Sequence, residues 1–207
     1  YGDKLVDRVD SCLLASLDSL LSCELSLINC VHQYDEIPSG DHLIRDLYNT
    51  DFSRCYLALD CLCRCPASEI FPLLKDSWIR EAHNDYGAHY CFVSLFGMIP
   101  DWPTEAEPWI IEVLLSSIFN MRPQFQKSRS TAVLALAKQN PKVLCEYMEE
   151  ILSSRDSMSW DMRYALIQAI DNYVDIDLAS KSNWFLKISD NDEDLFVQAR
   201  ARTALAL

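Results

Sequence analysis

Nine cysteines and four histidines are the side chains of this sequence with the most specific chemistry, because thiolates and imidazoles bind metals and act as nucleophiles or bases. Three of them, Cys61, Cys63 and Cys65, stand at alternate positions in the segment CLCRC. Alternate residues on a helix point about 200° apart, so these thiols cannot converge on one ion. The sequence contains no Cys-x2-Cys spacing and no His-Glu-x-x-His pair. We therefore expect no metal site and no cofactor.

Catalytic motifs are also missing from the sequence. Its four glycines, at positions 2, 40, 87 and 97, are too scattered for a dinucleotide fingerprint, a phosphate loop or a nucleophile elbow. The 31 acidic residues guarantee chance pairs of carboxylates, so no pair by itself indicates acid–base catalysis. An odd number of cysteines favours reduced thiols in a reducing compartment, and we expect Cys55, Cys91 and Cys145 in the core. The sequence predicts a protein that is not an enzyme.

The charge balance excludes several classes of partner. A net charge of -13 repels phosphate backbones and anionic membrane surfaces, so we expect neither nucleic acid nor membrane as a partner. The longest stretch without charged residues runs from Tyr86 to Pro100, which is shorter than the roughly 20 residues of a spanning helix. Acidic residues interrupt the apolar N-terminal region and argue against a signal peptide, so we expect a cytoplasmic protein; they are Asp7, Asp10, Asp18 and Glu24.

A short pattern recurs along the chain: a basic or polar residue is followed by apolar residues three, six and seven positions later, except that Asp60 occupies one of these positions in the first copy. We call the first residue of each copy the marker residue; the markers are Arg54, His89, Arg129, Arg163 and Gln198. They recur at intervals of 34 to 40 residues, which indicates structural repeats. Each copy predicts a B helix. Segments with their own helical periodicity lie between them and predict A helices at residues 41–49, 68–82, 105–121, 141–153 and 180–189.

The B segments resemble the second helix of HEAT-type repeats. The resemblance is carried by LFGMI at 95–99, RSTAVLAL at 129–136, DMRYALIQAI at 161–170 and DLFVQARARTALAL at 194–207. It implies an all-α fold, an α-α superhelix or HEAT-like solenoid with an N-terminal helical cap. We expect a single domain over residues 1–207, in which residues 1–36 form the cap and residues 41–207 form about five HEAT-like helix pairs.

Some prominent side chains have a structural interpretation in such an array. In repeats of this type, an arginine at the marker position commonly pairs with an acidic residue in the A/B turn of its own or the adjacent unit. We therefore assign Arg129 and Arg163 to the scaffold. Trp78, Trp109 and Trp184 stand on A helices among aliphatic residues and are assigned to the core.

Aromatic and acidic residues are the candidate partner-binding surface. Tyrosine and tryptophan favour interfaces, and carboxylates around them steer a basic partner. The plainer alternative is that the acids form a solvated face and the tyrosines are half-buried. The candidates lie next to the markers, in loops and at helix ends; they are Tyr56, Tyr86, Tyr90, Trp160, Asp161, Tyr164, Asp171, Asp190, Asp192, Glu193 and Asp194.

A small, acidic repeat protein of this kind resembles bacterial immunity proteins of the contact-dependent inhibition or polymorphic toxin type. That resemblance implies a non-catalytic protein that covers the active site of a basic, nuclease-type toxin domain. The alternative is a HEAT-repeat scaffold fragment that binds a peptide or an assembly subunit. HEAT-like DNA glycosylases need a cationic surface, which this charge disfavours. HEAT-like lyases that attach bilin pigments to proteins are a lesser alternative, suggested by the number of thiols.

Overall fold

The computed structural model of the protein describes residues 39–190 and 192–205. These residues form helices and the loops between them, and no strand occurs among them, which confirms the all-α fold class. They fall into two compact units, which divide after Cys61. The expected N-terminal cap at residues 1–36 lies outside the described residues, and the single-domain organisation stays a prediction. Within the described ranges, no helix is long and apolar enough to cross a membrane.

The described part of the first unit consists of α2 (Gly40–Asp46) and the start of α3 (Phe52–Arg64). Leu43, Leu47 and Ala58 are almost completely removed from solvent and belong to its core. Cys55, also buried as expected, donates its thiol hydrogen toward the carbonyl oxygen of Asn49 at 3.0 Å. The connection between α2 and α3 is thereby tied to the first turn of α3.

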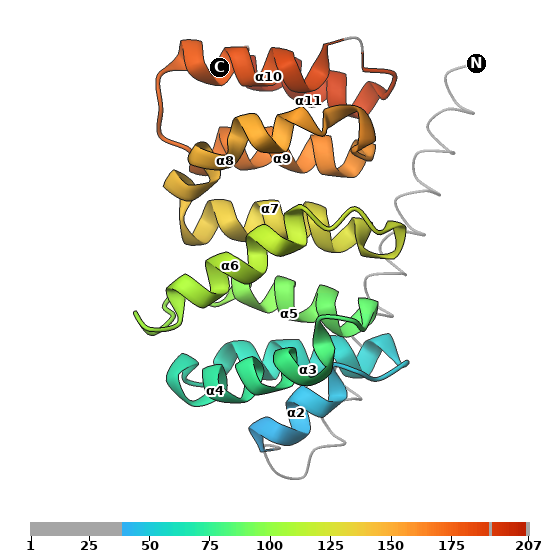
Figure 1. Ribbon diagram of the computed structural model, residues 1–207, viewed down its shortest axis with the longest axis vertical. Coiled ribbons are helices and arrows are strands. Elements are labelled where there is room, and N and C mark those ends of the chain that lie inside the picture. The colour runs from blue at the N-terminus through green and yellow to red at the C-terminus, as the bar shows by residue number, and fades with distance from the viewer. Residues whose placement is uncertain (1–38, 191, 206–207) are drawn as a thin grey trace, which may run out of the picture. The chain divides into compact units, whose positions relative to one another are not determined.

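The second unit contains four successive helix pairs (Figure 1). Short 3-10 turns at Pro123–Phe125 and Arg155–Ser157 lie before two of the B helices, and a π-helical turn at Trp78–Ala82 extends the first A helix. Its A helices are α4 (Ala67–Ser77), α6 (Glu107–Ile118), α8 (Pro141–Ser153) and α10 (Leu178–Ser189). Its B helices are α5 (Tyr86–Met98), α7 (Gln126–Gln139), α9 (Trp160–Tyr173) and α11 (Leu195–Leu205).

The B helices of this unit form one layer, in which α7 packs between α5 and α9, and α9 between α7 and α11 (Figure 1). In α5, α7 and α9 the apolar positions predicted from the repeat are buried; in α9, Leu166, Ala169 and Ile170 are fully inaccessible to solvent. In α11 the predicted position Leu205 is exposed. The A helices cover this layer, with α6 and α8 against α7 and α10 against α9 and α11. One pair cannot bury its apolar face alone, so each pair needs its neighbour.

Local signals set several helix starts. Asp85 and Asp177 are N-cap residues whose carboxylates accept backbone N–H bonds from the first turns of α5 and α10. Asn140 caps α8 in the same way, and Pro141 stands at the first helical position, where its missing N–H costs no hydrogen bond. Pro72 lies inside α4, which begins earlier, at Ala67, and changes to a π-turn after Ser77.

An aromatic cluster fills the space around the first pairs of the second unit. Trp78 is buried there as expected, with its ring near those of Phe92, Phe96 and Trp109. Trp109 itself keeps partial exposure. The core assignment of Trp184 was wrong: this residue is half-buried, and its indole N–H donates to the exposed Glu149 carboxylate at 3.4 Å.

The helices α5 and α7 approach each other most closely at Gly97. A Cβ atom added to this glycine would lie 2.9 Å from the Cβ of Ala135 and 3.0 Å from its Cα. Ala135 is itself buried. Backbone on the opposite helix cannot move aside as the end of a flexible side chain can, so this position accepts only glycine without a shift of the two helices.

We expect Gly97→Ala to lower the free energy of unfolding by about 1–3 kcal/mol, because the added methyl group overpacks the α5–α7 contact. Thermal or urea denaturation followed by circular dichroism measures the change. Gly87→Ala is the matched control, since its Cβ would meet only a carboxylate oxygen of Asp85 at 3.4 Å. Equal stability of the Gly97→Ala variant and the parent would contradict the close approach.

His89, a marker residue, is buried in the same region. Its ring lies between Trp78 and Phe125, with centroids 4.7 Å from each. Its Nε2 is 2.9 Å from the hydroxyl oxygen of Ser117, and that hydroxyl donates to the carbonyl of Val113. Nε2 therefore donates to Ser117. Burial lowers the pKa of His89 to about 4, so the imidazole is neutral at physiological pH.

The lowered pKa of His89 predicts a pH-dependent stability. As pH falls below about 6.5, the unfolded state takes up a proton on this imidazole before the folded state does. We expect the free energy of unfolding to drop by about 3 kcal/mol between pH 6.5 and pH 4. Urea titrations across that range measure it. His89→Phe removes the titrating group, so its stability should change much less over the same interval; a parallel decline in both proteins would contradict the assignment.

Candidate functional site

A hollow lies on the layer of B helices in the second unit. It has a volume of about 380 Å³ and is lined by residues of α7, α9 and α11, without any contribution from an A helix. We call it the aromatic groove, and its lining residues are Ser130, Thr131, Leu134, Trp160, Asp161, Tyr164, Ala165, Gln168 and Phe196. Its volume falls in the range of about 300–1,000 Å³ that is common for ligand pockets.

Two exposed aromatic rings form one wall of the aromatic groove. Trp160 begins α9 and is 51% exposed, and Phe196 in the first turn of α11 is 70% exposed. Their ring centroids are 6.2 Å apart with 38° between the planes. Large apolar side chains in contact with water, gathered at a concave place, are typical of a surface that binds something.

Asp161 supplies the negative charge of the groove. Its Oδ2 accepts a hydrogen bond of 3.2 Å from the Ser130 hydroxyl on α7. Burial lowers the pKa of the Arg129 guanidinium, and the charge of Asp161 opposes that shift, so the two groups attract each other. Asp161 lies in the first turn of α9, whose N-cap is Ser159.

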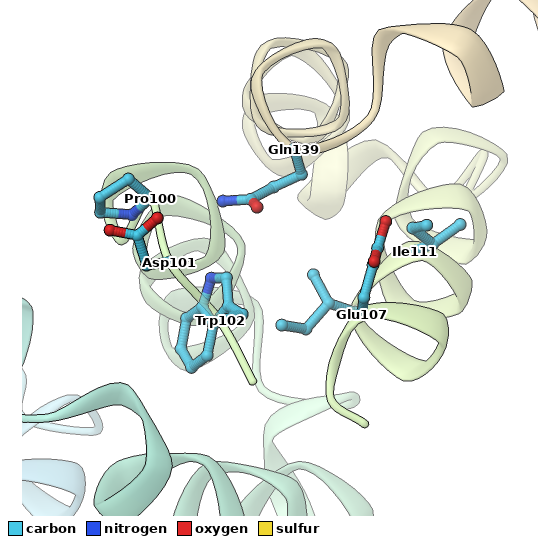
Figure 2. A pocket seen from close by; sticks show the side chains of 7 residues that line it. Pro100, Asp101, Trp102, Glu107, Ile111 and Gln139 are labelled. Atoms are coloured by element: carbon cyan, nitrogen blue, oxygen red, sulfur yellow. The ribbon is translucent and has the colours of Figure 1, made fainter. Parts of the chain in front are cut away.

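A second cavity, of about 230 Å³, lies between the α5–α6 loop, α6 and the end of α7 (Figure 2). Its polar groups hold the loop: the Gln139 side-chain amide donates to the carbonyls of Phe96 and Ile99 at 2.6 and 2.7 Å. The Trp102 indole N–H also points to the Phe96 carbonyl, at 3.3 Å. Because these donors already bond to backbone carbonyls of the protein, we assign the cavity to the contact between α7 and the end of α5.

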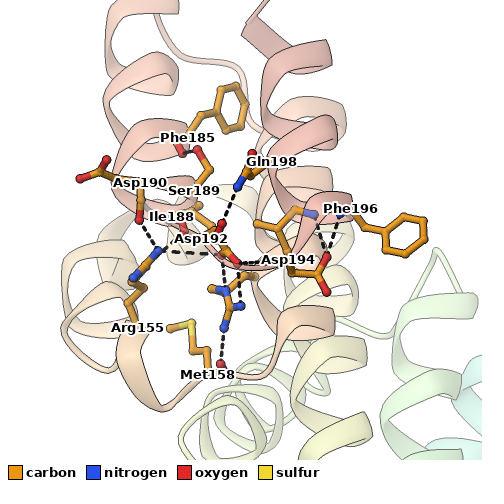
Figure 3. A network of polar contacts seen from close by, with 12 residues as sticks. Arg155, Met158, Phe185, Ile188, Ser189, Asp190, Asp192, Asp194, Phe196 and Gln198 are labelled. Carbon is orange, nitrogen blue, oxygen red and sulfur yellow. Dashed lines mark hydrogen bonds and ion pairs between the residues drawn. The ribbon is translucent and has the colours of Figure 1, made fainter.

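Asp192 occupies a structural position, contrary to its assignment to a partner surface. Its side chain is completely buried and paired with Arg163 at 2.5 Å, with Arg155 3.9 Å away (Figure 3). It also accepts the backbone N–H of Asp194. Burial alone would raise the pKa of the Asp192 carboxyl, but the hydrogen bonds and the charges of the two arginines outweigh burial and lower that pKa. The pairing of Arg163 with the A/B turn of the adjacent pair is confirmed.

The structure scatters the other candidate residues. Tyr56, in the first unit, and Tyr86, at the start of α5, are 54% and 66% exposed. Tyr90 is half-buried on α5, and its carbonyl accepts a bond from Ser94. Asp171 is held by Arg200 at 2.6 Å.

The remaining acidic candidates surround the turn before α11. The carbonyl of Asp190 accepts a hydrogen bond from Arg155, and Asp194 caps the first turn of α11 through the backbone N–H groups of Phe196 and Val197. Glu193 is exposed. Only Trp160, Asp161 and Tyr164 of the predicted set come together, at the aromatic groove.

Sequence reasoning missed Phe196, Ser130 and Gln168 as groove residues. A signal for Phe196 existed: it stands two residues before the marker Gln198, just as Asp161 stands two residues before the marker Arg163. Ser130 stands one residue after its marker, as Tyr164 does. Extending the same repeat positions to all three B helices would have found these two residues together.

Metal chemistry and thiol chemistry find little support in the described part of the chain. No group of three or more His, Cys, Asp or Glu residues there could hold a metal ion. Cys91 is buried as expected, while Cys145 on α8 is only half-buried. Burial raises the pKa of the Cys145 thiol, which keeps it in the protonated form at neutral pH.

Known proteins are similar in sequence to this chain over most or all of its length. Bilin biosynthesis protein CpeY of Synechococcus sp. (strain WH8020) is 66% identical over 206 residues, 100% of this chain and 49% of that protein. The chain is similar to a bilin biosynthesis protein. The uncharacterized phycocyanin operon protein Y of Pseudanabaena tenuis (strain PCC 7409) is 34% identical over 176 residues, 84% of this chain and 38% of that protein. The chain thus spans about half the length of the first relative, and less of the second. No family model and no solved structure matches.

These relatives overturn the functional expectations from the sequence. The resemblance to toxin-immunity proteins was wrong, as were the scaffold alternative and the basic nuclease partner, because the relatives are named for bilin biosynthesis and for a phycocyanin operon. The expectation of a protein that is not an enzyme is also overturned, since the first of these names describes a biosynthetic role. Acidic charge and small size are properties that many kinds of protein share, and so they selected the wrong class.

The buried ion pair gives a prediction for stability. We expect Asp192→Ala to lower the free energy of unfolding by about 3–5 kcal/mol, because it leaves the Arg163 guanidinium without its partner. Chemical denaturation measures the loss. Glu193→Ala, the exposed neighbour, is the control and should change stability by less than about 0.5 kcal/mol. Equal stability of the two variants would contradict the structural role of Asp192.

Proposed function

We propose that this chain is part of a protein that attaches a bilin to a phycobiliprotein. The observation that carries the proposal is its 66% identity, over the whole chain, to a bilin biosynthesis protein. The second relative, named for a phycocyanin operon, supports the same setting, because phycocyanin is a bilin-carrying protein. The cytoplasmic location inferred from the sequence is kept as part of this proposal.

The attachment reaction requires few chemical groups from the protein. A cysteine thiol of the acceptor protein adds across an exocyclic carbon–carbon double bond of the bilin. One sulfur–carbon bond forms, the thiol hydrogen ends on the neighbouring carbon, and nothing is oxidised, reduced or released. The protein must therefore bind the bilin, orient the reacting double bond and admit the acceptor cysteine, and proximity of this kind is a large part of catalysis.

The described structure offers a surface suited to that task. Four B helices form a layer that is ordered by close helix contacts, and the aromatic groove opens on this layer at α7, α9 and α11. A binding site built on packed helices holds a ligand more firmly than one built on loops. The Cys145 thiol, whose pKa is raised, is not suited to act as a thiolate nucleophile, and the reaction needs none from this chain.

Mixing the protein with a bilin and an apo-phycobiliprotein subunit tests the proposal. We expect colour that stays with the acceptor polypeptide after denaturation, formed faster in the presence of the protein and located on one cysteine. Mass spectrometry of acceptor peptides identifies the modified residue, and an acceptor in which that cysteine is serine is the control. The same rate and the same mixture of products without the protein would overturn the proposed function.

A further inference from the structure

We propose that the aromatic groove is the place where this protein binds the bilin, with Trp160 and Phe196 against the pyrrole rings and Asp161 accepting hydrogen bonds from pyrrole N–H groups. This inference rests on the proposed function, which supplies the ligand. It adds a site, three named side chains and their roles.

The aromatic wall of the groove suits the flat part of a bilin. A bilin is an open-chain tetrapyrrole with conjugated, apolar ring faces, and such faces stack well on aromatic side chains. Trp160 and Phe196 are both more than half exposed, so their rings are accessible to a ligand. Their planes are tilted by 38° at a centroid distance of 6.2 Å, and two rings so placed can contact successive pyrroles of a twisted chain.

Asp161 supplies the polar recognition that the rings cannot. Its Oδ2 already accepts from Ser130, and its Oδ1 has no hydrogen-bond partner among the described residues. A carboxylate oxygen accepts readily from N–H donors, and the bond strengthens if the conjugated system carries a positive charge. The inner edge of a bilin presents several pyrrole N–H groups in a row. Asp161 can therefore fix the orientation of the ligand along the groove.

The size and openness of the groove fit attachment to another protein. At about 380 Å³ it can enclose only a part of a tetrapyrrole, so the remaining rings stay accessible to solvent. An acceptor protein could then bring its cysteine to the bilin from outside. The second cavity is smaller, at about 230 Å³, and its Gln139 and Trp102 donors already bond to backbone carbonyls of the protein.

Absorption titration with biliverdin, an open-chain tetrapyrrole, tests the site in the purified protein. We expect the double variant Trp160→Ala with Phe196→Ala to bind at least about tenfold more weakly, since two stacking contacts are lost. Asp161→Asn keeps the shape of the side chain and removes its charge, so it should alter the wavelength of the bound pigment as well as weaken binding. Trp160→Tyr keeps an aromatic face and should retain most of the affinity.

Matched controls stand outside the groove. Leu186→Ala removes an apolar side chain on α10 that is 57% exposed, and Asp175→Asn removes an exposed carboxylate; both should leave binding unchanged. Melting temperatures identify any variant that fails to fold. If the double alanine variant fails, Trp160→Leu with Phe196→Leu replaces it, because leucine keeps apolar bulk and removes both aromatic faces.

The outcomes separate the two proposals. If the parent protein binds biliverdin and the groove variants bind it equally well with an unchanged spectrum, the groove assignment is overturned and the proposed function stands. If the parent protein neither binds biliverdin nor promotes attachment, the proposed function fails and the groove assignment falls with it. The assignment is supported if the groove variants bind biliverdin more weakly while the control variants bind it as the parent protein does.

Discussion

The buried ion pair between Arg163 and Asp192 determines how the last two helix pairs meet. A carboxylate without solvent contact stays charged only when donors surround it, and Asp192 has the Arg163 guanidinium and the backbone N–H of Asp194 (Figure 3). Asp194 in turn caps α11 through the N–H of Phe196. One chain of polar contacts therefore runs from α9 to the start of α11 and holds Phe196 beside Trp160. The wall of the aromatic groove depends on that contact.

Polar contacts between helices recur along the second unit, and the side chains that make them differ from one marker to the next. His89 on α5 donates to Ser117 on α6, and Arg129 on α7 is attracted by Asp161 on α9. These two markers thus interact with an element of the following pair, as Arg163 does, while Arg129 also donates to the Ile118 carbonyl in its own pair. Apolar burial gives a repeat array most of its stability, but it is not directional and does not determine how neighbouring pairs align. These polar contacts define which part of one pair meets which part of the next.

The sequence analysis named several residues of the aromatic groove but predicted the wrong function for them. Tyr164 was a candidate because it follows its marker directly, and Trp160 and Asp161 were candidates in a loop or at a helix end. The structure brings these three residues together. Asp192 belonged to the same acidic surface by sequence, yet its side chain is buried. A run of acidic residues has the same composition whether its members are solvated or paired. Only the position of Arg163 on another helix decides between the two.

Periodicity and composition by themselves determined the helical class, the spacing of the B helices and the apolar faces that they bury, because these depend on interactions between residues close in sequence. The close approach at Gly97, the neutral state of His89 and the meeting of Trp160 with Phe196 were decided by the tertiary structure. In each case the partner lies on a different helix. Helical periodicity says which side of a helix a residue occupies, but not what stands opposite it.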